Sequence, residues 1–158
     1  MKRGVGLAAI KLSAFFFNHR MLPMWFAKAF AAGFVATLAF HQGLFALFHL
    51  AGLVPVPAYN FSPVPPLGVP AVLSLAFFGG LWGPPVAWLI RSDRGAAYWL
   101  KAFVFGAIGP TAVAMLLVFP LKGLAVEPKI VVGALLLNGA WGIGVALLMR
   151  LMAARARA

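Results

Sequence analysis

Polar side chains inside otherwise apolar stretches are the residues of this sequence that could do chemistry. The set is His41, Gln42, Ser74, Thr111 and Asn138. Polar groups are costly in a bilayer, so they mark either functional sites or hydrogen bonds between helices. His41, Gln42 and Asn138 each lie roughly 13 Å below the outer end of a predicted helix, at the helical rise per residue. Their equal depth predicts an intramembrane polar cluster, which either joins helices by hydrogen bonds or binds or conducts a small solute.

The three histidines do not match a metal or haem site. His41 and His49 fall on one face of a predicted helix, but their heights differ by about 12 Å, which is too much for one macrocycle. His19 falls on the opposite side of the membrane. The apolar stretches contain no carboxylate and the chain contains no cysteine, so ligands for hard metals and thiolate sites are lacking. We therefore expect no metal and no cofactor.

Catalysis has few groups to use in this chain. Asp93 and Glu127 are its only two acids, and both stand in predicted loops. The sequence contains no acid pair, nucleophile–base pair or phosphate-binding glycine loop. We therefore expect a protein that is not an enzyme, and an enzyme acting on a lipid-soluble substrate is the third of three functional hypotheses.

The composition indicates that lipid surrounds these residues. Of 158 residues, 64% are hydrophobic and 9% are charged, and the mean hydropathy is +1.01. A soluble domain carries about 25% charged residues. With so few charges the chain cannot cover a globule in solvated groups, which excludes a water-soluble monomer and predicts a small multi-pass membrane protein.

Four apolar stretches are long enough to cross about 30 Å of hydrocarbon as helices. They cover residues 24–50, 69–90, 97–119 and 130–149. These stretches are apolar on all sides and too long for barrel strands, so we expect an all-α, four-helix transmembrane domain over residues 24–158. Pro84, Pro85 and Pro110 should kink the helices rather than end them, because buried neighbours can satisfy the freed carbonyls.

Lysine and arginine gather on one side of these stretches. Of 13 such residues, 11 fall near the start of the first stretch, around the second loop or in the C-terminal tail, and 2 fall in the third loop. The positive-inside rule then places both termini in the cytoplasm. The bases expected to meet anionic lipid headgroups there are Lys28, Arg91, Arg94, Lys101 and Arg150. The same placement argues against nucleic acid as a partner of this basic chain.

Two segments flank the first stretch. Residues 1–23 carry bases around an apolar stripe, which predicts an amphipathic helix on the cytoplasmic leaflet, with a frayed basic tail as the alternative. The loop of residues 51–68 has no charge, and six prolines lie between Pro55 and Pro70. Because proline removes backbone donors and restricts φ, we expect a stiff, partly extended cap over the outer helix ends. Docking to a partner is the alternative role of this loop.

Two sequence patterns occur twice. KAFxxG begins at Lys28 and again at Lys101, 73 residues later, and GxWGxxVAxL begins at Gly80 and again at Gly139, 59 residues later. This spacing predicts a parallel internal repeat of two helical hairpins, related by a pseudo-twofold axis along the membrane normal. Small residues let helix backbones approach closely. The predicted packing residues are Gly33, Gly79, Gly80, Trp82, Gly83, Gly106, Gly139, Trp141 and Gly142.

In its GxWGxxVA hairpins and inside-positive loops, the chain resembles the small, uncharacterised four-helix proteins of bacterial inner membranes. The resemblance implies that the chain is located in the bacterial inner membrane, and it implies no activity. The favoured functional hypothesis is a protein that acts through helix–helix contacts at its glycine faces, as an accessory subunit of a membrane complex or as a homo-oligomer. The alternative is a small-solute carrier or channel with its polar site at His41, Gln42 and Asn138.

Overall fold

The fold was analysed in a computed structural model that describes residues 24–155. It contains four helices long and apolar enough to cross a membrane, Met24–Leu50, Ala71–Ile90, Gly95–Leu121 and Pro128–Arg155. The prediction of four apolar helices that are long enough to cross a membrane is therefore confirmed. The last helix is longer than the predicted stretch of residues 130–149, because its apolar part is continued by good helix formers up to Arg155. The predicted amphipathic helix of residues 1–23 lies outside the described residues.

Two of the four helices are interrupted by a π-helical turn. In the first span, Met24–Leu50, the turn η1 (Thr37–His41) precedes α2 (Gln42–Leu50). The third span consists of α4 (Gly95–Val113), η2 (Ala114–Val118) and α5 (Phe119–Leu121). The second and fourth spans are the unbroken helices α3 (Ala71–Ile90) and α6 (Pro128–Arg155).

The internal prolines do not end their helices. Pro84 and Pro85 lie within α3, and Pro110 lies within α4. Each proline lacks a backbone N–H and so leaves one carbonyl of the preceding turn without its usual donor. The helices nevertheless continue, as expected where neighbouring helices surround the chain.

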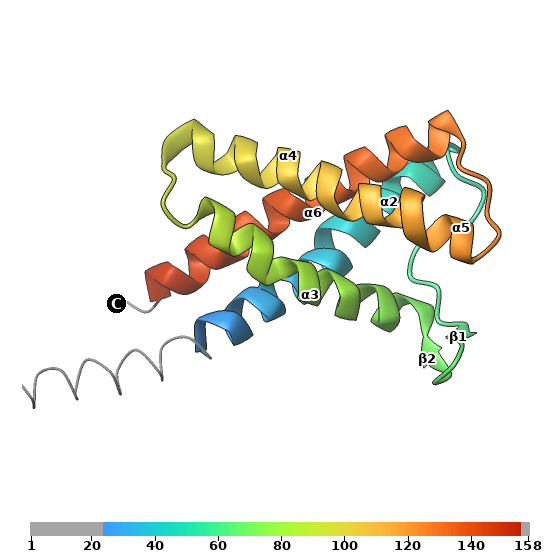
Figure 1. The fold of residues 1–158 in the computed structure, drawn as a ribbon, viewed down its shortest axis with the longest axis horizontal. Coiled ribbons are helices and arrows are strands. Elements are labelled where there is room, and N and C mark those ends of the chain that lie inside the picture. Colours follow the sequence, from blue (N-terminus) through green and yellow to red (C-terminus); the bar gives the residue numbers. More distant parts are fainter. Residues whose placement is uncertain (1–23, 156–158) are drawn as a thin grey trace, which may run out of the picture.

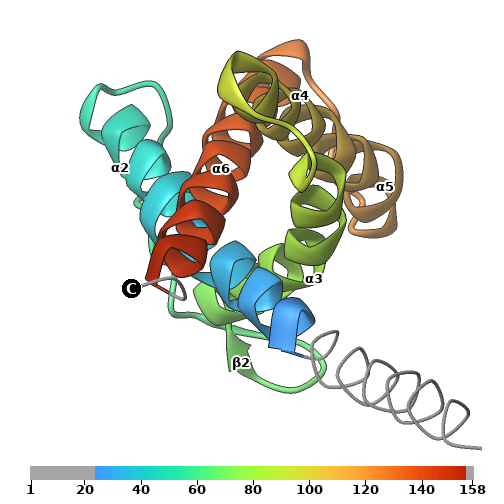
Figure 2. The same cartoon turned by 90° about the vertical axis from the view of Figure 1, so that its left-hand side faces the viewer.

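The four helices form one bundle with two distinct ends. The turn between α3 and α4 and both described chain ends lie at one end, and the loops 51–70 and 122–127 lie at the other (Figure 1). Viewed from the end, α6 runs beside α4 and also beside the first span, and α3 lies between the first span and α4 (Figure 2). The helices thus bring residues from distant parts of the sequence to the same depth.

The bundle interior is built mainly of small side chains. Residues exposed by at most 1% include Ala29, Ala32, Ala36, Ala102, Val145 and Ala146. Large apolar side chains point outward instead, with Leu116 80% exposed and Phe78 58% exposed. Lipid solvates such side chains as well as a protein core does, so helix packing here depends on close backbone approach rather than on burying bulk.

The loop of residues 51–70, which we call the cap, lies at one end of the bundle. It contains a short antiparallel pair, β1 (Pro63–Val64) and β2 (Val69–Pro70), with Pro63 opposite Pro70. The peptide bond between Pro65 and Pro66 is cis and lies in the turn that joins the two strands. Such short strands are typical of a loop in which prolines remove backbone donors.

Candidate functional site

Asn138 and Thr111 form the first of two polar groups within the bundle. Asn138 on α6 donates a hydrogen bond from Nδ2 to Thr111 Oγ1 on α4, at 2.9 Å. Thr111 is buried, and the backbone carbonyl of Asn138 packs against Gly106. The inclusion of both residues in the predicted polar cluster therefore corresponds to a direct contact between α4 and α6.

His41 and Gln42 form the second polar group, which faces the cap. The Oε1 atom of Gln42 accepts a hydrogen bond from the backbone N–H of Tyr59 at 2.7 Å, and its Nε2 atom lies 3.4 Å from His41 Nδ1. The Tyr59 hydroxyl donates to the carbonyl of Leu38, within η1, at 2.8 Å. These two hydrogen bonds of Tyr59 thus help to fasten the cap to the first span.

Tyr59 is a residue that sequence reasoning missed. Its φ is +57°, an uncommon value for a residue with a Cβ atom, and it is held there by bonds from both its backbone and its side chain. The available signal was that an uncharged, proline-rich loop contains one of only two tyrosines in the chain. A tyrosine hydroxyl beside a membrane helix usually finds an acceptor.

The structure does not unite the five polar residues predicted to cluster. Within residues 24–155, no hydrogen bond joins the Asn138 group to the His41 group, and Ser74 on α3 bonds to neither. The buried side-chain nitrogen and oxygen atoms of this region all have hydrogen-bond partners. The arrangement thus has the chemistry of paired structural hydrogen bonds, with no unpartnered buried group aimed at a ligand in the described chain.

A double-mutant cycle on the Asn138–Thr111 pair tests this structural role. Asn138→Ala and Thr111→Val should each lower the thermal stability of the protein in detergent, with a coupling energy of about 0.6 kcal/mol, the average for such pairs in membranes. The coupling is obtained from unfolding of both single variants and the double variant. Strictly additive losses would show that the hydrogen bond contributes nothing to the α4–α6 contact.

Glycines at the contact of the first span with α3 admit no side chain. A Cβ atom on Gly33 would overlap the carbonyl oxygen of Gly79, and one on Gly83 would overlap the carbonyl oxygen of Ala29. Gly80 lies against the ring of Phe30 on the same interface. These two helices therefore touch backbone to backbone.

The contact of α4 with α6 repeats this arrangement. A Cβ atom on Gly106 would lie 2.8 Å from the Cα of Gly142 and 2.9 Å from the carbonyl oxygen of Asn138. One on Gly142 would overlap the carbonyl oxygen of Ala102, and Gly139 lies against the ring of Phe103. The glycines of this contact and the residues that they meet each stand 73 or 59 positions after their counterparts in the first contact. The one difference in type is Asn138, which stands where the first contact has Gly79.

The two repeated tryptophans connect these helix pairs. Trp141 on α6 is 2% exposed, and its Nε1 atom donates to the carbonyl oxygen of Gly33 at 2.9 Å. The hydroxyl of Thr37 donates to the same oxygen at 3.0 Å. Trp82 on α3 packs on Gly109 of α4 and meets the ring of Phe105 edge-on, at 6.3 Å between centroids. Both indoles therefore fill space between helices.

Basic residues surround the end of the bundle that carries the α3–α4 turn. Lys101 Nζ lies 2.7 Å from Asp93 Oδ1, and the guanidinium of Arg91 lies 4.4 Å from the centre of the Trp88 ring. Arg150 stacks over Tyr98, whose buried hydroxyl donates to the carbonyl of Ala146 at 2.7 Å. Lys28 lies near the start of the first span, and Arg94 directly precedes α4, so both belong to the same end. These contacts keep the cations near the helix ends, where headgroups would lie.

Neither a metal centre nor a known relative adds to this description. Within the part of the chain that the structure describes, no three histidine or acidic side chains come close enough to hold a metal ion. No family model, curated protein or solved structure is significantly similar to this chain. The function must therefore be argued from the contacts above.

Proposed function

We propose that this chain is an integral protein of the bacterial inner membrane that acts through helix–helix contacts, as an accessory subunit of a membrane complex or as a homo-oligomer, and not by catalysis. The observation that carries the proposal is the pairing of its intramembrane polar groups. Asn138 bonds to Thr111 and Gln42 bonds to Tyr59, so these side chains hold the fold together. A carrier would need such groups free to receive a solute.

The glycine faces were expected to receive the partner, but they are used within the chain. Gly33, Gly83, Gly106 and Gly142 all pack against backbone of neighbouring helices. A partner would therefore contact the outer helix surfaces, where large apolar side chains such as Leu116 are exposed. This surface matches the hydrocarbon of lipid or the apolar face of another membrane protein.

The proposed orientation places both termini in the cytoplasm. In the described chain, six lysines and arginines belong to the end that carries the α3–α4 turn and both chain ends, and two belong to the opposite end. The positive-inside rule favours the six-cation end as the cytoplasmic one. Anionic lipid headgroups are the proposed partners of these cations.

We also propose that the bundle arose by duplication of a two-helix hairpin. The support is the match between its two backbone contacts, since Ala29, Gly33, Gly83 and their counterparts repeat with offsets of 73 and 59 residues. Small residues recur easily in apolar sequences. A chance recurrence of small residues would not also bring the corresponding residues of both copies into the same pairwise contacts.

The proposal is tested by isolating the full-length chain from native membranes in a mild detergent. We expect it to run as a stoichiometric complex, with a second copy or another membrane protein, in native mass spectrometry. His41→Ala and Asn138→Ala variants should stay in that complex, because both residues bond within the chain. Reconstitution of the same preparation in liposomes measures solute flux in parallel.

Two results would overturn the proposal. A monomer that moves a small solute across liposomes, with flux lost in His41→Ala, would establish the carrier hypothesis instead. A monomer without flux would remove the contact role altogether. Mass spectrometry of the isolated complex identifies any partner directly.

A further inference from the structure

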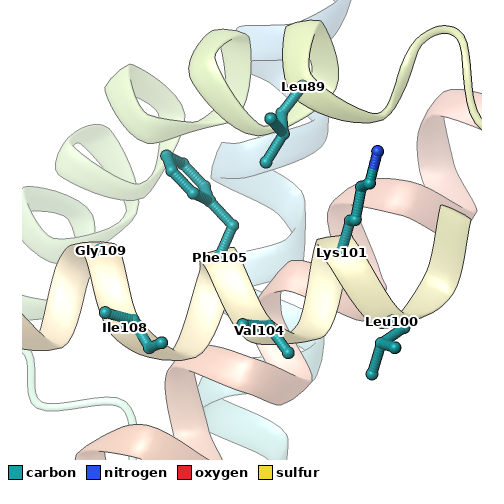
Figure 3. Close-up of a pocket in the computed structure, with 7 residues that line it drawn as sticks. All are labelled: Leu89, Leu100, Lys101, Val104, Phe105, Ile108 and Gly109. Carbon is teal, nitrogen blue, oxygen red and sulfur yellow. The ribbon is translucent and has the colours of Figure 1, made fainter. Parts of the chain in front are cut away.

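An apolar groove runs between α3 and α4 at the end of the bundle that carries the basic residues. Its volume is about 410 Å³, within the roughly 300–1,000 Å³ of small-molecule sites. Leu89 of α3 points toward α4, and Phe105 and Lys101 of α4 point toward α3 (Figure 3). Leu100 and Ile108 line the groove and are more than half exposed, so it opens onto the lipid-facing surface.

A second apolar groove lies beside the first. It has a volume of about 400 Å³, and the residues unique to it are Trp25, Phe26, Pro84, Pro85 and Trp88. The two grooves share Leu89 and Phe105, which form a ridge between them. Two adjacent apolar grooves separated by one ridge match the two acyl chains of a diacyl lipid better than they match a single helix.

One basic residue stands at the mouth of each groove. Lys101 lines the first groove, and Arg91 stacks on Trp88 of the second. Lys101 uses one of its three ammonium donors on Asp93, and its side chain is 50% exposed. With Arg94, the α3–α4 turn and the start of α4 carry three cations and one carboxylate, a local excess of positive charge. Lysine and arginine are the side chains that bind phosphate.

The depth of the first groove fits one leaflet. From Lys101 to Ile108 a helix rises roughly 10 Å, most of the roughly 15 Å of hydrocarbon in one leaflet. A phosphate at Lys101 would thus lie at headgroup level while its acyl chain reached toward the bilayer centre.

We propose that these two grooves bind one anionic diacyl phospholipid of the cytoplasmic leaflet, with its acyl chains on either side of the Leu89–Phe105 ridge and its phosphate between Arg91 and Lys101. The inference rests on the proposed membrane placement and gives the proposed anionic-lipid partner a specific site. The lipid is selected by charge at the mouths of the grooves and retained by apolar contact along them.

The charge selectivity is tested on the full-length protein in detergent, with phosphatidylglycerol and phosphatidylcholine that carry identical acyl chains. Wild-type protein should retain phosphatidylglycerol preferentially in native mass spectrometry. The Arg91→Gln, Lys101→Gln double variant should bind phosphatidylglycerol on the order of twentyfold more weakly, about fivefold for each cation removed. Its binding of phosphatidylcholine should weaken less, because the choline cation of that headgroup offsets the charge of its phosphate. Lys129→Gln is the matched control, because Lys129 pairs with Glu127 at the opposite end of the bundle.

The apolar part of the site is tested by filling the first groove. Val104→Trp should lower the retention of both lipids several-fold, because the indole would occupy the acyl-chain slot that Val104 lines. Leu116→Trp, on an 80% exposed position of the same span, should leave retention unchanged. Should Val104→Trp fail to give monodisperse protein, the charge variants alone decide the matter, since they change only surface residues.

Equal retention of the two lipids by the wild type would overturn this site, as would equal losses in the Arg91/Lys101 variant and in Lys129→Gln. These outcomes are separate from the test of the proposed function. Unselective lipid binding by a chain that stays in its complex removes only the lipid site. Selective binding of phosphatidylglycerol by a chain that is monomeric removes only the contact role.

Discussion

Gly142→Ala should lower the melting temperature of the detergent-solubilised protein by on the order of 5 °C. The added Cβ atom would overlap the carbonyl oxygen of Ala102, so α6 and α4 would have to separate. Overpacking of this kind costs roughly 1–3 kcal/mol, and each kcal/mol shifts the melting temperature by about 2–4 °C in a chain of this size. A rigid backbone atom cannot move aside as a flexible side chain could. Circular dichroism during heating measures the effect.

Gly133→Ala is the control on the same helix. A Cβ atom at Gly133 would meet nothing within 4 Å, so the gain in helix propensity should leave stability equal or slightly higher. Gly83→Ala should reproduce the loss seen for Gly142→Ala, because its Cβ atom would overlap the equivalent carbonyl of Ala29. Gly43→Ala on the first span should not lower the melting temperature, because a Cβ atom there would meet nothing within 4 Å. Equal behaviour of all four variants would contradict the close helix contacts and remove the main support for the proposed duplication.

Trp141→Ala should destabilise the protein more than any of these glycine variants. Removing a large buried aromatic side chain costs roughly 3–5 kcal/mol, and Trp141 is 2% exposed. The variant also loses the Nε1 hydrogen bond to the Gly33 carbonyl, which joins α6 to the first span across 108 residues of sequence. We expect the melting temperature to fall by on the order of 10 °C.

Trp141→Phe separates the two contributions. Phenylalanine keeps part of the ring packing but lacks the indole N–H, so the loss should be intermediate. Trp88→Ala controls for the loss of a tryptophan as such, because Trp88 is 58% exposed and lies on the outer surface of α3. If Trp88→Ala were as damaging as Trp141→Ala, the indole–Gly33 contact would not be the feature that joins α6 to the first span.

These predictions reflect how the interior of the bundle differs from its outer surface. Alanines and glycines such as Ala36 and Gly106 occupy the interior, and leucines such as Leu116 face outward. In water this distribution would expose the residues that most need burial. In lipid it is stable, since hydrocarbon surrounds the leucines and the interior gains close van der Waals contact.

The amino-acid sequence by itself determined the four spans, because span length and apolar composition depend only on local residues and on the thickness of the bilayer. It also located both repeated glycine patterns. A helix contact that is too close for side chains requires glycine, and glycine can be read directly from the sequence. The one clear difference in bounds is at Arg150–Arg155, where helix propensity extends α6 beyond its apolar part.

Only the tertiary structure decided which polar residues meet. The position of a residue in the sequence gives its depth in the bilayer, but contact also depends on rotation about the helix axis and on which helix lies opposite. Asn138 therefore reaches Thr111 and not His41, although His41 and Asn138 were expected at equal depth. The bonds of Tyr59 to the first span and the two grooves beside Leu89 likewise depend on how separate segments pack, which no local pattern records.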